Sequence, residues 1–154
     1  MKEELILLFS FLLIAGITAG CKGESRTEFD PGKVVQIDAG HVDIFVPVKA
    51  TQSTTIDTQG WAADRKAGSP LTELIVVSDG KQTSLAPKMS ISRPDVAKAL
   101  SNPALEKVGW SLPIPAASLG SGKHKLEFYA VLSDKTFAAL YCGPRKFCEV
   151  EVTP

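Results

Sequence analysis

The sequence predicts a mainly β fold, an antiparallel β-sandwich with one short inserted helix. Ten prolines and twelve glycines are spread along the 154 residues, which is typical of many turns between short elements. Several short runs alternate apolar and polar side chains, and their number and spacing suit a sandwich of about seven to nine strands. Only residues 92–100 have helical spacing instead.

Residues 125–132 form the clearest predicted strand, because every second side chain is apolar. The side chains that share this face are Leu126, Phe128, Ala130 and Leu132. Asp79 and Gly80 predict a tight turn between strands at 71–77 and 81–85. The other expected strands cover residues 34–37, 41–48, 54–62, 109–115, 136–142 and 148–152.

The helix is predicted at residues 92–100. Ser92 is expected to cap it, Pro94 suits the first turn, and Asp95 is favourable near the positive end of the helix dipole. An Asn–Pro pair at 102–103 is expected to end it.

Residues 1–20 are predicted to be a lipoprotein signal peptide. Residues 5–17 carry no charge, and this run is shorter than the about 20 residues that a membrane-spanning helix needs. Residues 18–21, Thr-Ala-Gly-Cys, resemble the bacterial lipobox, although Thr18 stands where Leu, Val or Ile is more usual. Cys21 is therefore expected to carry the lipid. The alternatives are an ordinary secretory signal and an uncleaved anchor.

After cleavage, residues 21–32 are expected to form a flexible, polar tether, and residues 33–154 a single domain. The lipid would hold this domain at a membrane surface in the cell envelope. By resemblance to known lipoproteins, Lys22 after the lipidated cysteine permits sorting to the outer membrane of a Gram-negative host, facing the periplasm or the cell surface.

Cys142 and Cys148 are expected to form a structural disulfide. They enclose a five-residue connection with a Gly-Pro turn signal, and a hairpin would place them opposite each other on the buried face. Export favours oxidation. The alternatives are a redox pair, which usually has C-x-x-C spacing, and half of a metal site, which lacks further ligands nearby.

An ordered set of short motifs carries a family resemblance. Gly60-Trp61-Ala62-Ala63-Asp64 is followed by Asp79-Gly80, by Arg93-Pro94-Asp95-Val96-Ala97, by Gly109-Trp110 and by Leu119-x-x-Gly122-x-His124-x-Leu126. Together they resemble the immunoglobulin-like accessory domains of bacterial surface proteins and of some membrane glycosyltransferases. The resemblance implies an immunoglobulin-like sandwich with a short helix between strands, and it implies no activity.

Four residues are candidates for ligand binding. Trp61 and Trp110 could offer ring faces to sugars, and Arg93 with Asp95 could form a recognition pair. The alternatives are that both tryptophans belong to the core, and that Asp95 caps the helix while Arg93 braces it.

No catalytic residue, metal ligand or cofactor is expected. The chain has only two histidines, His41 and His124, and a hydrolase would have to use one of them. Asp57, Asp64 and Asp79 could bind calcium, but they do not form a calcium-binding loop, so we expect solvated turn acids. Seventeen basic and seventeen acidic side chains balance, which argues against nucleic acid as a partner.

These observations favour a non-catalytic, lipid-anchored module that binds an envelope protein or glycan. An envelope hydrolase that uses His41 or His124, and a structural subunit of an envelope assembly, are the alternatives.

Overall fold

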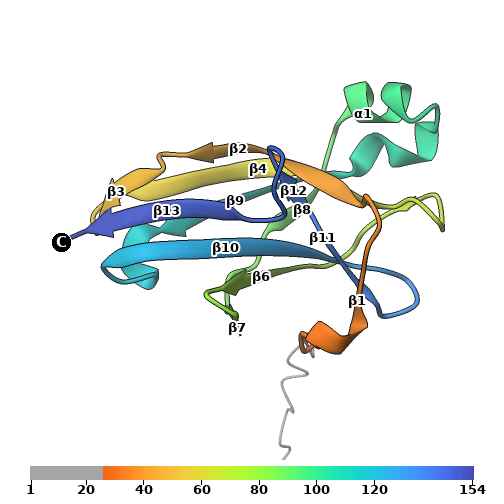
Figure 1. Cartoon of the computed structure of the whole chain (residues 1–154). Helices are drawn as coiled ribbons and strands as arrows, with labels where there is room; N and C mark the ends of the chain where they lie inside the picture. The colour runs from red at the N-terminus through yellow and green to blue at the C-terminus, as the bar shows by residue number, and fades with distance from the viewer. Residues whose placement is uncertain (1–25) are drawn as a thin grey trace, which may run out of the picture.

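A computed structural model describes residues 26–154, which form two packed β-sheets with one α-helix at one end of the sandwich (Figure 1). The expected signal peptide and Cys21 lie outside the described residues. None of the helices in the described part is both long and apolar enough to cross a membrane. The predicted mainly β fold with one short helix is confirmed.

Sheet A is built around the long strand β10. Because β6 pairs with the middle of β10 and overlaps the registers of both β11 and β13, these two strands share the opposite edge of β10. The seven strands of sheet A are β1 (Val34–Val35), β3 (Lys49–Thr51), β6 (Leu74–Ser78), β7 (Lys81–Gln82), β10 (Gly122–Val131), β11 (Phe137–Ala139) and β13 (Cys148–Thr153).

Sheet B has the order β12-β2-β4-β9-β8, with β5 paired to the end of β4. Its six strands are β2 (Gly40–Val46), β4 (Thr55–Asp64), β5 (Ser69–Pro70), β8 (Lys88–Ile91), β9 (Gly109–Pro115) and β12 (Tyr141–Cys142). The remaining elements are the helix α1 (Pro94–Ala99) and the 3-10 turns η1 (Pro31–Lys33), η2 (Pro103–Lys107) and η3 (Ala116–Ser118).

The sheets are mixed, whereas the sequence predicts an antiparallel sandwich. Three short parallel pairs, β1 with β11, β12 with β2, and β13 with β3, accompany the antiparallel pairs. The physical reason is that the chain changes sheets within single connections. Pro47 has no N–H to continue the ladder of β2, and the chain passes there from sheet B to sheet A. Leu140 separates β11 in sheet A from β12 in sheet B.

The core lies between the sheets. The predicted inward face of β10 is buried there as expected, together with apolar side chains of β4, β6, β9 and β13. At its centre, Trp110 of sheet B stacks on Phe128 of sheet A, with ring centroids 5.2 Å apart. Both rings are fully buried, so this pair joins the two layers by apolar contact.

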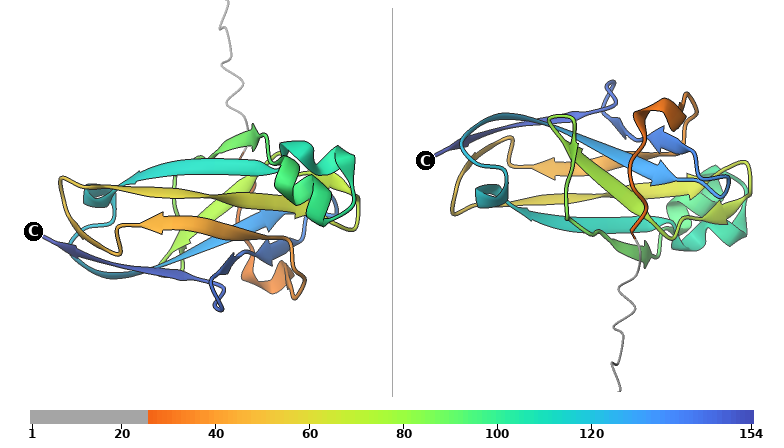
Figure 2. Two further views of the ribbon diagram at one scale, coloured as in Figure 1. Left: turned by 90° about the horizontal axis from the view of Figure 1, so that it is seen from above. Right: turned by 90° about the horizontal axis from the view of Figure 1, so that it is seen from below.

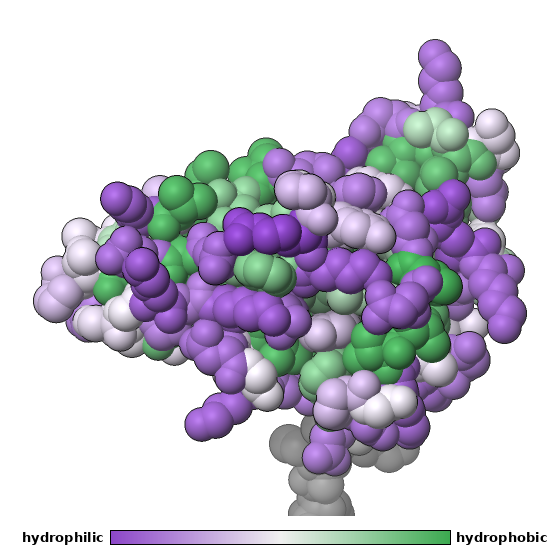
Figure 3. Space-filling model, viewed as in Figure 1, coloured by the Kyte–Doolittle hydropathy of each residue, from purple (hydrophilic) through white to green (hydrophobic). Residues whose placement is uncertain are grey.

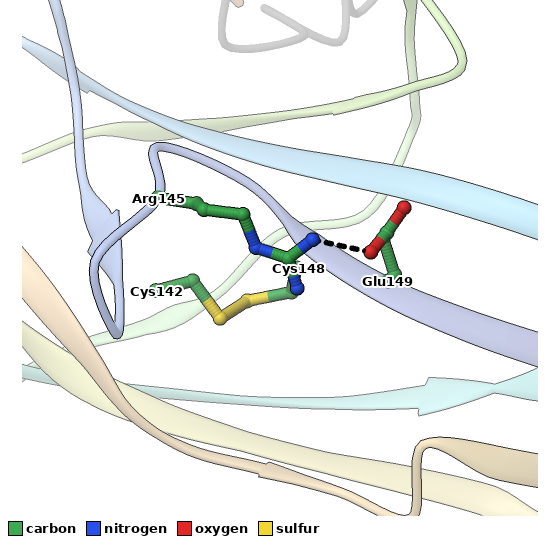
Figure 4. The surroundings of a disulfide bond; sticks show 4 residues. All are labelled: Cys142, Arg145, Cys148 and Glu149. Carbon is green, nitrogen blue, oxygen red and sulfur yellow. Dashed lines mark hydrogen bonds and ion pairs between the residues drawn. A yellow bond between two sulfur atoms is a disulfide. The ribbon is translucent and has the colours of Figure 1, made fainter.

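The disulfide between Cys142 and Cys148 is confirmed, but the hairpin expected to contain it is not (Figure 4). Cys142 pairs with Val42 in sheet B, whereas Cys148 pairs with Leu126 in sheet A. The two Cα atoms are 5.5 Å apart. The disulfide therefore links the two sheets, because the chain crosses between them at this point.

The N-cap of the helix lies one residue later than expected. Arg93 occupies the N-cap position without a side-chain cap, and the hydroxyl of Ser92 donates to Glu106 instead. Ser92 is therefore not the cap, because its hydroxyl is hydrogen-bonded to a residue of the turn η2 and not to the start of the helix. Pro94 and Asp95 lie in the first turn as predicted.

Thr27 and Phe29 contact the domain, although they lie in the segment expected to be a free tether, whereas residues 30–32 are exposed. The backbone N–H of Thr27 donates to Glu73, and Phe29 contacts the rings of Tyr129 and Phe137. The apolar ring at position 29 explains the difference, because burying it stabilises the attached segment.

Reduction of the disulfide should lower the free energy of unfolding by about 2 kcal/mol, because the bridge closes only a short loop. The separation of six residues sets this small value. Urea denaturation with and without reductant measures the difference. A Cys142→Ala/Cys148→Ala variant is the control, and reductant should leave its stability unchanged. A reductant effect of the same size in that variant would contradict the assignment.

Candidate functional site

The two Gly–Trp dipeptides of the sequence face each other in the ladder between β4 and β9. Gly60 lies opposite Trp110, and Trp61 lies opposite Gly109. Trp110 is 1% exposed and points into the core, and within residues 26–154 its indole N–H has no hydrogen-bond partner. Trp110 is thus a core residue, and its candidate role in ligand binding is wrong because a ligand cannot reach it.

Trp61 lies on the outer face of sheet B, in a row with two other rings. Tyr141 pairs with His41, and His41 pairs with Trp61, across β12, β2 and β4. The ring centroids are 5.3 Å apart for Tyr141 and His41, and 5.6 Å apart for His41 and Trp61. Lys146 places its ammonium over the Tyr141 ring. All three rings are half-buried, and Trp61 also packs against a small apolar cluster beneath α1 and η2.

Arg93 lies beside this row, and its guanidinium is paired with two carboxylates. A Cβ at Gly109 would clash with the Arg93 side chain, so the glycine makes room for it. The guanidinium donates two hydrogen bonds to Asp95, of 2.9 and 2.7 Å, and one of 2.7 Å to Asp43 on β2.

These bonds have electrostatic consequences. The hydrogen bonds to Asp95 are the largest cause of the raised pKa of Arg93, and they lower the pKa of Asp95 to about 2. Because all its hydrogen bonds go to these carboxylates, Arg93 braces the start of α1 against β2. The recognition-pair hypothesis therefore has little support from the geometry.

Apolar side chains continue the outer face along β2. Ile44 and Val46 are 40% and 52% exposed, and they pair with the outward-facing Gln59 and Asp57 of β4. Figure 3 shows hydrophobic side chains gathered over β2 at the upper left of the molecule. We call the set formed by Tyr141, His41, Trp61, Ile44 and Val46 the β2 surface.

The β2 surface ends at an open strand edge. β12 pairs with only two residues of β2, His41 and Val42, so the backbone edge from Asp43 onward has no partner strand among the described residues. A bulge between Val42 and Ile44 interrupts the ladder to β4 there. Open edges of this kind are available for pairing with another chain.

His124 lies on the opposite sheet and is held on both sides. Its Nδ1 atom is 2.8 Å from Asp79, and its Nε2 atom is 3.1 Å from the carbonyl oxygen of Gly120. Both ring nitrogens therefore face oxygen acceptors, which leaves neither free to take a proton from a nucleophile. The backbone N–H of Lys125 is the main cause of the lowered pKa of Asp79, and His124 contributes to it.

His41 also lacks a catalytic arrangement in the described part of the chain. Its Nε2 atom is 3.8 Å from Asp38, and Asp38 accepts a hydrogen bond from Arg65. Within residues 26–154, neither His41 nor His124 is hydrogen-bonded to a hydroxyl or thiol group. No group of three or more His, Cys, Asp or Glu side chains in that range could hold a metal ion.

Asp64 is buried, whereas we expected a solvated turn acid. It is 3% exposed and accepts hydrogen bonds from the backbone N–H of Ala67 and from both the N–H and the hydroxyl of Ser133. Burial would raise the pKa of Asp64, but these hydrogen bonds outweigh it and lower the pKa. Asp64 thereby ties the end of β4 to the turn after β10.

No protein-family model matches the chain, and no curated protein matches it in sequence. The proposals below therefore rest on the sequence and on the geometry just described.

Sequence reasoning identified Trp61 but missed its neighbours. The sequence alone indicates His41 only as a possible catalytic residue and gives no role to Tyr141, because their contact depends on the short parallel pair between β12 and β2. The sequence around Ile44 predicts a regular alternating strand. The bulge that turns Ile44 outward has no recognisable sequence pattern.

Replacing Asp64 by Asn should lower the free energy of unfolding at pH 7 by about 1–3 kcal/mol, because bonds to a buried charge are lost. The loss should shrink as the pH falls below the ordinary carboxyl value of 3.8. A lowered folded-state pKa stabilises the fold above the unfolded-state value, and this contribution disappears as the folded carboxylate is protonated.

Urea denaturation at several pH values tests this expectation. Asp57→Asn is the matched control, since Asp57 is exposed on the same strand, and its effect should be small at every pH. A loss for Asp64→Asn that is independent of pH would show that the charge has no role.

Proposed function

We propose that the protein is a lipid-anchored, non-catalytic binding module of the bacterial cell envelope, with the β2 surface as its contact face. Two observations support this location in the cell. Residues 1–20 resemble a signal peptide and are followed directly by Cys21. The domain also contains a disulfide, which is typical of proteins outside the cytoplasm.

The composition of the β2 surface favours a protein partner. Aromatic and aliphatic side chains form its centre, and charged groups of both signs, such as Arg93 with Asp43 and Arg65 with Asp38, lie at its margin. An apolar centre with a charged rim is typical of protein–protein interfaces. This face, with exposed aliphatic side chains beside half-buried rings, is the observation that carries the proposal.

A glycan is a weaker candidate for the same face. Sugars stack on free ring faces, but His41 lies between Tyr141 and Trp61, and Lys146 covers the outer face of Tyr141. The hydrolase alternative has less support still, because both nitrogens of His124 are committed to structural hydrogen bonds.

The anchor is tested by intact-mass analysis of protein from its native host. The mature chain should begin at Cys21 and carry the mass of a diacylglyceryl group. Cys21→Ser should lose this mass, because it removes the thiol that accepts the lipid. An unlipidated full-length wild-type chain would overturn the proposed address.

The contact face is tested by photo-crosslinking in intact cells. A photoreactive phenylalanine analogue at Val46 should give one adduct with an envelope protein, and Ile44→Asp, introduced together with it, should abolish the adduct. The analogue at Lys123, on the outer face of sheet A, is the control and should give no such adduct. Adducts of equal yield from both positions would contradict a specific face, and an adduct with glycan alone would replace the protein partner.

A further inference from the structure

A second set of contacts lies on the opposite side of the molecule, where the chain enters the domain. Residues 26–33, which we call the strap, cross the outer face of sheet A before β1 begins. Figure 2 shows this segment passing in front of sheet A when the molecule is seen from below. The strap starts at the β7 side of the sheet and ends at β11, with which β1 pairs.

Polar contacts hold the beginning of the strap. The guanidinium of Arg26 donates to the carbonyl oxygens of Thr83 and Leu85, just after β7. The backbone N–H and the hydroxyl of Thr27 both donate to the Glu73 carboxylate.

A single glutamine side chain then pairs with the strap backbone as a neighbouring strand would. The amide of Gln82 accepts from the N–H of Phe29 and donates to the carbonyl oxygen of Thr27. These bonds fix the direction in which the strap crosses the sheet.

An apolar contact holds the middle of the strap. The outer face of sheet A carries a second buried cluster, separate from the core, and Phe29 and Val34 cover it. The ring of Phe29 lies 4.4 Å from that of Tyr129 and 5.3 Å from that of Phe137, measured between centroids. The residues of this cluster are Ile75, Val77, Tyr129, Val131, Phe137 and Ala139.

The length of chain before the strap limits where the domain can lie. From Cys21 to Arg26 the chain can span at most about 18 Å, even when fully extended. Two packed sheets are about 10 Å apart, and the side chains of both outer faces add to this thickness. A lipid on Cys21 therefore keeps the β7 side of sheet A next to the membrane for as long as the strap stays docked.

The β2 surface lies on the far side from this exit. It occupies the outer face of the other sheet, and Tyr141 on β12 stands at the edge opposite β8. We propose that the strap docks the outer face of sheet A, at its β7 side, against the lipid bilayer and so turns the β2 surface away from the membrane. The bilayer is the occupant of this face. The inference rests on the proposed lipid anchor and specifies how the anchored domain is oriented.

The test uses the lipidated protein in vesicles of phosphatidylethanolamine and phosphatidylglycerol. Because Cys21 carries the lipid and Cys142 and Cys148 are joined, one added cysteine is the only free thiol for a small fluorescent label. The label is placed by Lys81→Cys on β7 or by Asp57→Cys on the outer face of sheet B. A lipid with a nitroxide on its headgroup should quench the label at position 81 severalfold more than the label at position 57.

Releasing the strap should remove this contrast. Arg26→Ala, Phe29→Ala, Glu73→Ala and Gln82→Ala together delete the polar, amide and apolar contacts of the strap. Its eight residues, 26–33, would then add up to about 29 Å of reach. We call this the released-strap variant. Glu28→Ala is the matched control, since Glu28 is an exposed strap residue, and it should preserve the contrast. Thermal unfolding verifies that each variant is folded.

The outcomes separate the two proposals. Equal quenching at positions 81 and 57 in protein of the lipidated mass would overturn the orientation and leave the anchor standing. Protein without the lipid mass would overturn the anchor, and the orientation with it. A contrast that persists in the released-strap variant would show that the strap does not set the orientation.

Discussion

The stacking of Trp110 on Phe128 is the contact on which the rest of the structure depends. It joins the centres of sheets A and B, and the apolar inner faces of both sheets pack around it. The large indole fits because Gly60 has no side chain, since a Cβ there would lie 2.8 Å from the ring. With the layers fixed in this way, β2 and β4 present the β2 surface outward, and β10 presents the opposite face that the strap covers.

The outer faces of sheets A and B differ in whether their apolar side chains are covered. On sheet A, the chain's own segment covers the apolar cluster around Tyr129, and burial, with a smaller contribution from Glu127, raises the pKa of that phenol to about 12. On sheet B, Ile44 and Val46 remain exposed, although burying them would be favourable. This asymmetry is the basis for proposing that one side faces the membrane and the other a partner.

Local pattern predicts much of the fold. The strand at 109–115 has the predicted bounds, and Asp79 and Gly80 both have positive φ, as the predicted hairpin turn requires. Long-range contacts account for the failures. The sheet that receives Cys142 depends on where β2 lies, and alternation within residues 136–142 cannot reveal that the chain changes sheets at Leu140. The burial of Asp64 likewise depends on Ser133, 69 positions away.

The paired Gly–Trp dipeptides also specify the register between β4 and β9. A slip by one position would reverse which side chains of β4 face inward, exchanging Trp61 for Gly60, and would deprive the Trp110 ring of its space. A misaligned chain would thus place both indoles in an interior that has room for only one. Four residues thereby select one pairing during folding and penalise its nearest competitors.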